Sequence, residues 1–364
     1  MSYPFLPEFS RGLGVPLEAL VLLMAARSAM SIFAPLVGGL SDRFGRRTIM
    51  YISLAGFSLM MFGVSIFPVF IIFVIATLLE GLFKFLFDAT TYAYIGDRVP
   101  YERRGLVIGI MEIAWSAAFL IGMPLIGWLM ARRFVDAWQA PFPLLGAAGL
   151  IGVVALWFSL PHDRPQGKKS KKSTRTGWAS ILKNRSAMAA LAVGLLMSAA
   201  SENLNVVLGI WLESYYGLSL AALGLSTAVI GVAELVGEGG VIGLVDRIGK
   251  KRAIIIGALG SALSYFVLPL IANELVGGLI GLFMTFVTFE FTIVATLPMM
   301  TELVPGARAS LMSLNSAGHA LGRMGGALIG NWLFGLGFFW NGAFGALANI
   351  LAAAILILWV HDSD

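Results

Sequence analysis

The chain has 364 residues, of which 58% are hydrophobic and only 12% are charged, and its mean hydropathy is +0.87. A soluble domain carries roughly twice that share of charge, so the composition excludes an ordinary water-soluble domain and favours a chain that lies mostly in lipid. There is no cysteine, which excludes disulfides and thiolate metal sites.

Apolar stretches of about 20 residues, separated by short polar breaks, predict membrane-spanning helices. In the first part of the chain we expect them at about 18–40, 48–66, 68–96, 105–130 and 141–160. In the second part we expect them at about 187–211, 219–242, 253–271, 275–301, 308–333 and 338–360. The predicted fold class is therefore all-α integral membrane, with about 11 transmembrane helices.

The basic residues predict the orientation of these helices. Most of the 25 Lys and Arg residues lie in alternate breaks, at 41–47, 97–104, 161–186, 243–252 and 302–308. The other breaks hold only Arg11, Arg132 and Arg133. By the positive-inside rule, the first set is expected on the cytoplasmic side of the cell membrane, together with the central loop and the C-terminus.

A glycine-rich, charged segment occurs twice in the chain. Asp42 and Asp246 are 204 positions apart, and the neighbouring glycines and basic residues keep this offset. Such a register over a long span indicates an internal repeat. We therefore expect an N-terminal bundle at 1–160, a basic cytoplasmic linker at 161–185 and a C-terminal bundle at 186–364. The linker sets topology, and the alternative is that it also binds anionic lipid.

The repeat also indicates that one helix is missing from the first copy. Residues 187–211 have no counterpart there, and the stretch from Tyr3 to Gly14 matches the exit of that helix, Trp211 to Leu218. We expect the chain to begin at the tail end of a first helix. Its first bundle would then hold helices two to six of the pattern, and its second bundle helices seven to twelve.

The repeated segment, the two bundles and the central basic loop together resemble the major facilitator superfamily of secondary transporters. The resemblance covers essentially the whole chain and implies two pseudo-symmetric halves. In that family the loop between helices two and three latches the cytoplasmic ends of the halves together. The residues that resemble this latch and its partners are Gly38, Asp42, Arg43, Gly45, Arg46, Arg47, Asp97, Arg98, Arg103, Asp246, Arg247, Gly249, Lys250, Glu302 and Arg308. The alternative is that they only set topology.

Two further likenesses to the family are weaker. In helix four, Thr77 stands where the family usually carries an arginine, which puts arginine-centred proton coupling at that position in doubt. In helix five, Gly122, Pro124 and Gly127 resemble the kink of the family's antiporters, although other glycines of that motif are replaced. A packing kink without functional meaning is the alternative.

Charged side chains inside the predicted spans are functional candidates, because each costs about 2.5 kcal/mol or more in the bilayer core. Acids outnumber bases among them. With the polar residues of helices seven and eleven, the candidates for proton coupling or a substrate cavity are Arg27, Glu80, Lys84, Asp88, Glu112, Glu202, Asn203, Asn205, Glu234, Glu238, Glu290, His319 and Arg323. The alternatives are that the surplus acids attract a cationic substrate, or that they are neutral and hydrogen-bonded.

The spacing of these residues predicts their neighbours. Glu80, Lys84 and Asp88 share one helix face and are expected to form a self-contained network. Glu234 and Glu238 are like charges one turn apart, which is suited to proton exchange with a watery cavity.

Helix eleven carries two stripes of different chemistry. Gly322, Gly326 and Gly330 form one for close helix packing. His319 and Arg323 form a second stripe that is expected to face the cavity, with a packed polar role as the alternative for the histidine.

Motifs of other function classes are absent from the sequence. There is no phosphate-binding loop, no zinc-protease signature and no serine-nucleophile elbow, so we expect neither an enzyme nor a bound metal or cofactor. The expected partners are an unknown small-molecule substrate and the lipid bilayer, with no nucleic acid and a monomeric protein.

We predict a secondary transporter that moves a small organic solute by alternating access, as proton-coupled efflux driven by the proton gradient. Proton-coupled uptake of a sugar or organic acid is the alternative within the same fold. A transport-inactive membrane sensor or scaffold is the alternative of another class, although the intramembrane acids argue against it.

Overall fold

The computed structural model describes residues 3–30, 40–41, 43–100, 107, 110–111, 113–132, 136–160, 180–304 and 307–360. In the first half, up to residue 160, the elements are η1 (Tyr3–Phe5), α1 (Leu6–Leu13), α2 (Leu17–Ala29), α4 (Arg46–Ile66), α5 (Phe70–Arg98), the π-helical turn η3 (Ala118–Gly122), α7 (Met123–Ala131), η4 (Ala137–Gln139) and α8 (Pro141–Ser159). In the second half, from residue 180, they are α10 (Arg185–Asn205), α11 (Leu208–Tyr216), α12 (Leu220–Ser226), α13 (Ala228–Ile248), α14 (Lys250–Ile271), α15 (Leu275–Leu303), α16 (Arg308–Leu336) and α17 (Phe338–Trp359).

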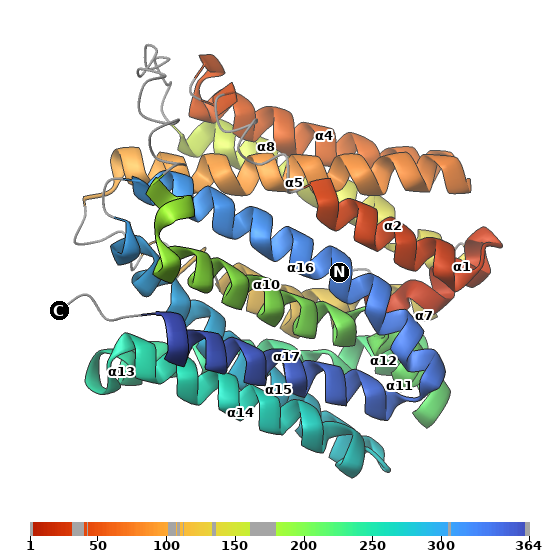
Figure 1. The fold of residues 1–364 in the computed structure, drawn as a ribbon. Helices are drawn as coiled ribbons and strands as arrows, with labels where there is room; N and C mark the ends of the chain where they lie inside the picture. Colours follow the sequence, from red (N-terminus) through yellow and green to blue (C-terminus); the bar gives the residue numbers. More distant parts are fainter. Residues whose placement is uncertain are drawn as a thin grey trace.

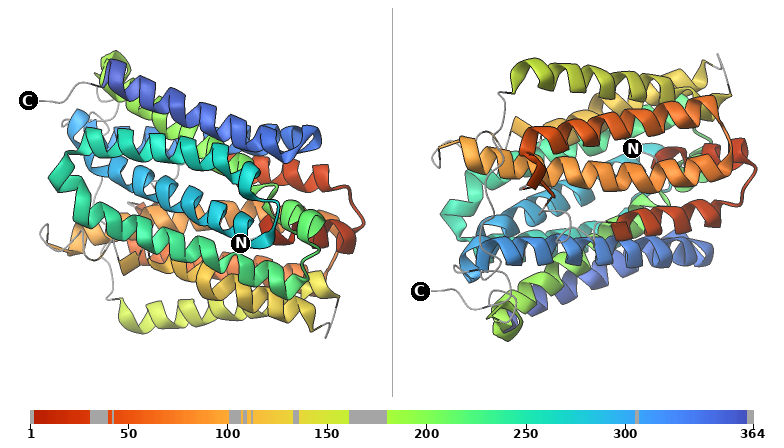
Figure 2. Two further views of the ribbon diagram at one scale, coloured as in Figure 1. Left: turned by 90° about the horizontal axis from the view of Figure 1, so that it is seen from below. Right: turned by 90° about the horizontal axis from the view of Figure 1, so that it is seen from above.

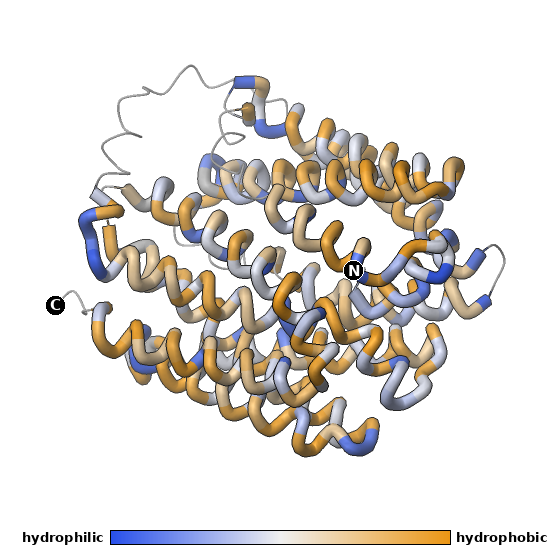
Figure 3. The backbone as a smooth tube through the Cα atoms, turned by 45° about the vertical axis from the view of Figure 1, so that its right-hand side comes forward, coloured by the Kyte–Doolittle hydropathy of each residue, from blue (hydrophilic) through white to orange (hydrophobic). Residues whose placement is uncertain are grey.

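The all-α membrane fold expected from the sequence is confirmed. Within the described ranges there is no strand, and nine helices are long and apolar enough to cross a membrane. Two further expected spans correspond to the 13-residue α2 and to the 29-residue α16, which carries His319 and Arg323. Hydrophobic segments follow the helices, and hydrophilic ones gather mainly at helix ends (Figure 3).

The helices run alongside one another as a bundle (Figure 1, Figure 2). In the first half, α4 packs against α5 and α8, and in the second half α14 packs against α15 and α17. The two halves meet where α2 packs against α16 and where α7 packs against α12. The small residues of α10 allow it to lie close to both α16 and α17, so this helix is the most buried span.

The internal repeat is visible in the backbone of the chain reversals. Gly14 ends α1 and Gly217 ends α11, each with φ of +64°. Gly45 precedes α4 with φ of +91°, and Gly249 precedes α14 with φ of +86°. Side chains with a β-carbon rarely adopt these angles, which explains why glycine recurs at matched positions of the two copies.

The bundle has two chemically different ends. Arg46 at the start of α4, Arg98 at the end of α5 and Lys250 at the start of α14 lie at one end, which we call the basic end, at the left of Figure 1. Gly14 and Gly217 lie at the other, which we call the opposite end. Residues 161–179 of the expected linker lie outside the described residues.

Candidate functional site

At the basic end, the described ion pairs of the expected latch join helices of the same half. Arg46 Nε lies 3.2 Å from Asp97 Oδ2 and so connects α4 to α5. In the second half, Lys250 at the start of α14 pairs with Glu302 near the end of α15. The equivalent pairs recur in both copies because the repeat supplies a base and an acid at matching positions. They brace each half at its basic end.

The other predicted latch residues have different surroundings. Arg47 is buried, donates to the Trp157 carbonyl at 2.9 Å and so fastens α8 to α4. Arg43 and Arg98 lie over the rings of Phe44 and Tyr94, and Arg247 is exposed. Gly38, Asp42, Arg103 and the side chains of Asp246 and Arg308 lie outside the described part.

Between the halves lies a row of charged side chains, of which Arg27 and Glu80 form the first-half part. Arg27 Nε lies 2.7 Å from Glu80 Oε2, and Nη2 lies 3.0 Å from Oε1. This bidentate geometry joins α2 to α5. Gly81 makes it possible, because a Cβ added there would lie 2.9 Å from Arg27 Cγ. The spacing along α5 predicted that Glu80 would join Lys84 and Asp88, whereas Glu80 forms its ion pair with Arg27 of α2.

Glu202 is the second-half part of this row. Its side chain on α10 is only 3% exposed and accepts a hydrogen bond from the Tyr3 hydroxyl of η1. Arg323 on α16 and Arg27 on α2 both interact electrostatically with it. Glu202 thus lies where η1 and α2 of the first half meet α10 and α16 of the second, and we call Glu80, Arg27, Tyr3, Glu202 and Arg323 the central polar row.

Lys84 and Asp88 continue the same face of α5 toward the basic end. Lys84 Nζ lies 2.5 Å from Asp88 Oδ2 and 3.9 Å from the centre of the Trp115 ring. An ammonium group over an indole face is a favourable cation–π arrangement. Both charges of this pair are therefore compensated locally.

The acids of α13 and α15 form a separate group. Glu234 faces the fully buried Ser116 of helix five, and Glu238 adds a like charge one turn away. Glu290 of α15 lies against Gly237, since a Cβ added to Gly237 would lie 2.9 Å from Glu290 Cβ. Glu112 lies outside the described residues. This group is distinct from the central polar row.

The remaining polar candidates of helices seven and eleven pack within the second half. His319 Nδ1 lies 2.6 Å from Ser198 Oγ, so the histidine lies between α16 and α10. Asn203 donates to the Asn341 carbonyl at 2.9 Å, and Asn205 donates to Ser201. The structure therefore leaves Glu202 in the row and turns its neighbour Asn203 toward α17. The packed polar interpretation of His319 is the one this geometry supports.

Where the sequence predicts a kink in helix five, the structure has a π-helical turn. η3 ends at Gly122, and α7 begins at Met123 just before Pro124. Proline has no backbone N–H to donate, and a π turn is one way in which a helix accommodates the interruption. Beyond it, Gly127 lies against Gly224 of α12, with 3.1 Å between a Cβ added to Gly127 and Gly224 Cα. α7 thus touches the other half backbone to backbone.

The sequence did not predict a role for Tyr3, for Ser116 or for the pair of Arg11 with Glu213. Arg11 Nη1 lies 2.6 Å from Glu213 Oε1 and joins α1 to α11. Tyr3 carried no intramembrane signal, because it precedes the first predicted span. The available clue was the match between residues 3–14 and the exit of helix seven.

No cluster of three or more metal-ligating His, Asp or Glu side chains is found in the described ranges.

Comparison with known proteins gives consistent similarities. The family model of the Major Facilitator Superfamily matches residues 1–272 and 190–364. The chain is 26% identical to the MFS-type transporter YceJ of Bacillus subtilis (strain 168), over 84% of this chain and 77% of that protein. It is 23% identical to Multidrug resistance protein 2 of the same organism, over 99% and 91%.

Two other similarities concern a resistance protein and a solved structure. The chain is 30% identical to the class C tetracycline resistance protein of Escherichia coli, over 68% of this chain and 63% of that protein. A solved structure of the nucleoside transporter NupG superposes with a TM-score of 0.77 at 13% identity, covering 98% of this chain and 94% of that one. The latter similarity concerns the fold.

Proposed function

This chain is a member of the Major Facilitator Superfamily of membrane transporters, and we propose that it exports a small organic solute in exchange for protons. The observation that carries the proposal is the place of Glu202: a buried carboxyl on the second half, bound by Tyr3 of the first half and flanked by arginines. A carboxyl at the junction of two rocking halves is placed to bind a proton in one state and to release it in the other.

The chemistry of the row supports a role for Glu202 rather than Glu80. The Glu80 carboxylate is held by both donor groups of Arg27, so protonating it would break a bidentate ion pair. Glu202 is buried and accepts a hydrogen bond from the Tyr3 hydroxyl, which is a neutral donor. Of the two carboxyls, Glu202 is therefore the one that exchanges a proton with less loss of contact.

Export is favoured by the kinked helix five and by the relatives. Gly127 of the kink contacts the second half at the opposite end, where the halves must separate to release a solute outward. Relatives that share most of this chain are named as multidrug resistance and tetracycline resistance proteins. We take the basic end as cytoplasmic, so that solute enters there and leaves at the opposite end.

The test is coupled flux in proteoliposomes with a pH-sensitive dye inside and tetracycline or ethidium as the probe solute. The parent is expected to move protons against the probe. Glu202→Gln is expected to lower probe-driven proton flux at least about tenfold, because an amide cannot carry the proton. Glu274→Gln, an exposed acid before α15, is the matched control and should behave as the parent.

Probe-driven proton flux in Glu202→Gln equal to that of the parent would remove Glu202 from the mechanism. Protons that move with the probe, rather than against it, would replace export by proton-linked uptake. Absence of any coupled flux in the parent with these probes, together with a panel of sugars and organic acids, would favour the sensor or scaffold alternative.

A further inference from the structure

We propose that residues 3–13 act as a strap that seals the opposite end of the bundle, with Tyr3 as its inner anchor on Glu202. The chain connects this segment to α2 of the first half, yet several of its contacts lie on α10 and α11 of the second half. The inference rests on the proposed function, because it assigns Glu202 a second task beside proton exchange.

The strap is attached at two points along its length. At its inner end, the Tyr3 hydroxyl donates to Glu202 on α10. At its outer end, Arg11 Nη1 lies 2.6 Å from Glu213 Oε1 on α11. In both attachments the strap supplies the donor and the second half supplies the acid. Glu202 and Glu213 are 11 positions apart, so the strap is held near both of its ends and not at a single point.

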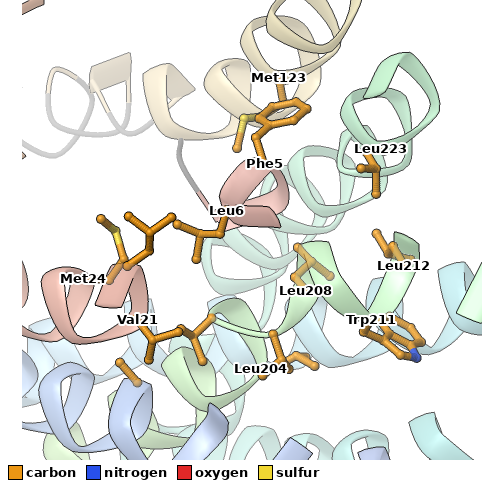
Figure 4. Close-up of a cluster of buried hydrophobic side chains, with 14 of the residues drawn as sticks. Phe5, Leu6, Val21, Met24, Met123, Leu204, Leu208, Trp211, Leu212 and Leu223 are labelled. Atoms are coloured by element: carbon orange, nitrogen blue, oxygen red, sulfur yellow. The ribbon is translucent and has the colours of Figure 1, made fainter. Parts of the chain in front are cut away.

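Between these points the strap lies directly on the second half. A Cβ added to Gly209 would lie 2.3 Å from the Pro4 carbonyl oxygen, so only glycine permits this approach of the backbone. Phe5 and Leu6 are each 1% exposed and belong to one hydrophobic cluster that includes Met123 of α7 and Leu223 of α12 (Figure 4). The strap therefore fills the space between helices of both halves.

The contacts at this end must be lost if the halves separate there. Solute release at the opposite end requires α7 to part from α12, and Phe5 is buried beside that contact. The strap cannot keep its second-half attachments while it moves with the first half. Opening is therefore opposed by the Tyr3–Glu202 and Arg11–Glu213 contacts together.

The chemistry of the Tyr3–Glu202 hydrogen bond also predicts which class of solute would release the strap. A protonated carboxyl keeps an acceptor oxygen for the Tyr3 hydroxyl, so a proton on Glu202 leaves the strap attached. A solute that carries a protonated amine takes the acceptor sites of the carboxylate for itself and displaces Tyr3. Arrival of a cationic solute thus opens the opposite end, and arrival of a proton does not.

The strap is testable without transport, because the chain has no cysteine of its own. The reporter is Leu223→Cys, at a position that is 1% exposed in the sealed cluster. Its rate of labelling by a water-soluble maleimide is measured in lipid nanodiscs. Adding Tyr3→Phe is expected to raise that rate about tenfold, since the variant loses a hydrogen bond to a charged group.

Matched variants separate the strap from general loosening. Tyr216→Phe removes a hydroxyl that donates to the Ala272 carbonyl at 2.6 Å within the second half, and it should leave the labelling rate within about twofold of the reporter alone. Glu202→Gln keeps an acceptor oxygen and should stay within about threefold, whereas Glu202→Leu should behave as Tyr3→Phe. Equal rates for Tyr3→Phe and Tyr216→Phe would overturn the proposal.

A second measurement fixes the strap in place. Arg11→Cys with Glu213→Cys, joined by a short reducible bifunctional thiosulfonate, is expected to lose at least about nine-tenths of probe flux and to regain it on reduction, because the cross-link prevents separation. Parental flux in the cross-linked protein would contradict the strap.

The two proposals fail in distinguishable ways. If the parent moves no probe, the proposed export fails, while maleimide labelling still decides whether the strap seals this end. If the parent moves probe and the labelling rates of the two tyrosine variants agree, export stands and the strap is wrong. Tetracycline carries a dimethylamino group that is protonated near neutral pH, so its addition to the Leu223→Cys reporter is expected to raise the labelling rate if a protonated amine displaces Tyr3. An unchanged labelling rate would remove that step.

Discussion

Glu80 is partly buried and Glu202 is buried, and both lie in the central polar row, but their neighbours differ. Glu80 is joined through both oxygens to Arg27, and the side chains of this pair are 18% and 26% exposed. Glu202 is joined to Tyr3 of the other half. One carboxyl thus braces α5 against α2 inside the first half, and the other joins the two halves.

Removal of the Arg27 side chain alone should therefore lower the free energy of unfolding more than removal of both charges of the pair. Arg27→Ala leaves the Glu80 carboxylate without its cation and is expected to lower the free energy of unfolding by roughly 3 kcal/mol. Arg27→Ala with Glu80→Gln should recover at least half of that loss. Thermal unfolding in detergent, read as a double-mutant cycle, checks this. A double variant as unstable as the single one would contradict it.

At the scale of elements, the glycine stripe of α16 explains how that helix approaches α10. Cβ atoms added to Gly322 and Gly326 would lie 2.2 and 2.4 Å from the carbonyl oxygens of Leu195 and Ala199. A Cβ added to the adjacent Gly325 would meet nothing within 4 Å. This geometry agrees with the packing role expected for the stripe. Gly325, on the same helix but outside the stripe, offers a control position for substitution.

Gly326→Ala should push α16 away from α10 and destabilise the protein by about 1–3 kcal/mol. Gly325→Ala fills open space and improves helix propensity, so its melting temperature should equal or exceed that of the parent. The melting temperatures of the purified variants check both statements. Equal destabilisation by the two substitutions would show that α16 does not pack as the structure has it.

The contact of α7 with α12 predicts an effect on conformation rather than on stability. A Cβ added to Gly127 would lie 2.5 Å from the Leu220 carbonyl oxygen of the other half. Gly127→Ala is thus expected to weaken closure of the opposite end and to speed labelling of Leu223→Cys. Gly63→Ala on α4, where an added Cβ meets nothing within 4 Å, should leave the rate unchanged. A slower rate in Gly127→Ala would mean that the contact does not hold this end closed.

At the scale of the whole molecule, the distribution of charge predicts the orientation in the membrane. Arg252 near the start of α14 and Asn273 just after its end are both exposed, and they lie at the two ends of one span. In intact cells an impermeant maleimide should label Asn273→Cys, and it should label Arg252→Cys only after permeabilisation. The reverse pattern would invert the orientation and the direction of transport proposed here.

Much of the fold could be predicted because its signals are local. The length of an apolar run is set by bilayer thickness, and a glycine at a positive φ is required by the chain reversal itself. Gly45 and Gly249 thus revealed the repeat without any knowledge of packing. The count of spans was less secure, since the 29-residue α16 carries His319 and Arg323 within its length.

The candidate site was predictable as a set of residue types and not as a set of partners. The spacing of Glu80, Lys84 and Asp88 predicted a network on one helix face, and in the structure Lys84 pairs with Asp88. It could not give the pairing of Glu80 with Arg27, because Arg27 reaches it from another helix over Gly81. Asn203 and Glu202 are neighbours in the chain but face different helices, a distinction that depends on helix rotation.

The sequence by itself determined an all-α membrane protein, its repeat and its family, because hydrophobic length, glycine conformation and charge bias act within short segments. Only the tertiary structure decided which acid is paired within a half and which joins the two halves. It also brought Tyr3 to Glu202, across 199 positions of chain. The energy of a buried charge depends on the side chains that surround it in space, and those come from helices that are distant in sequence.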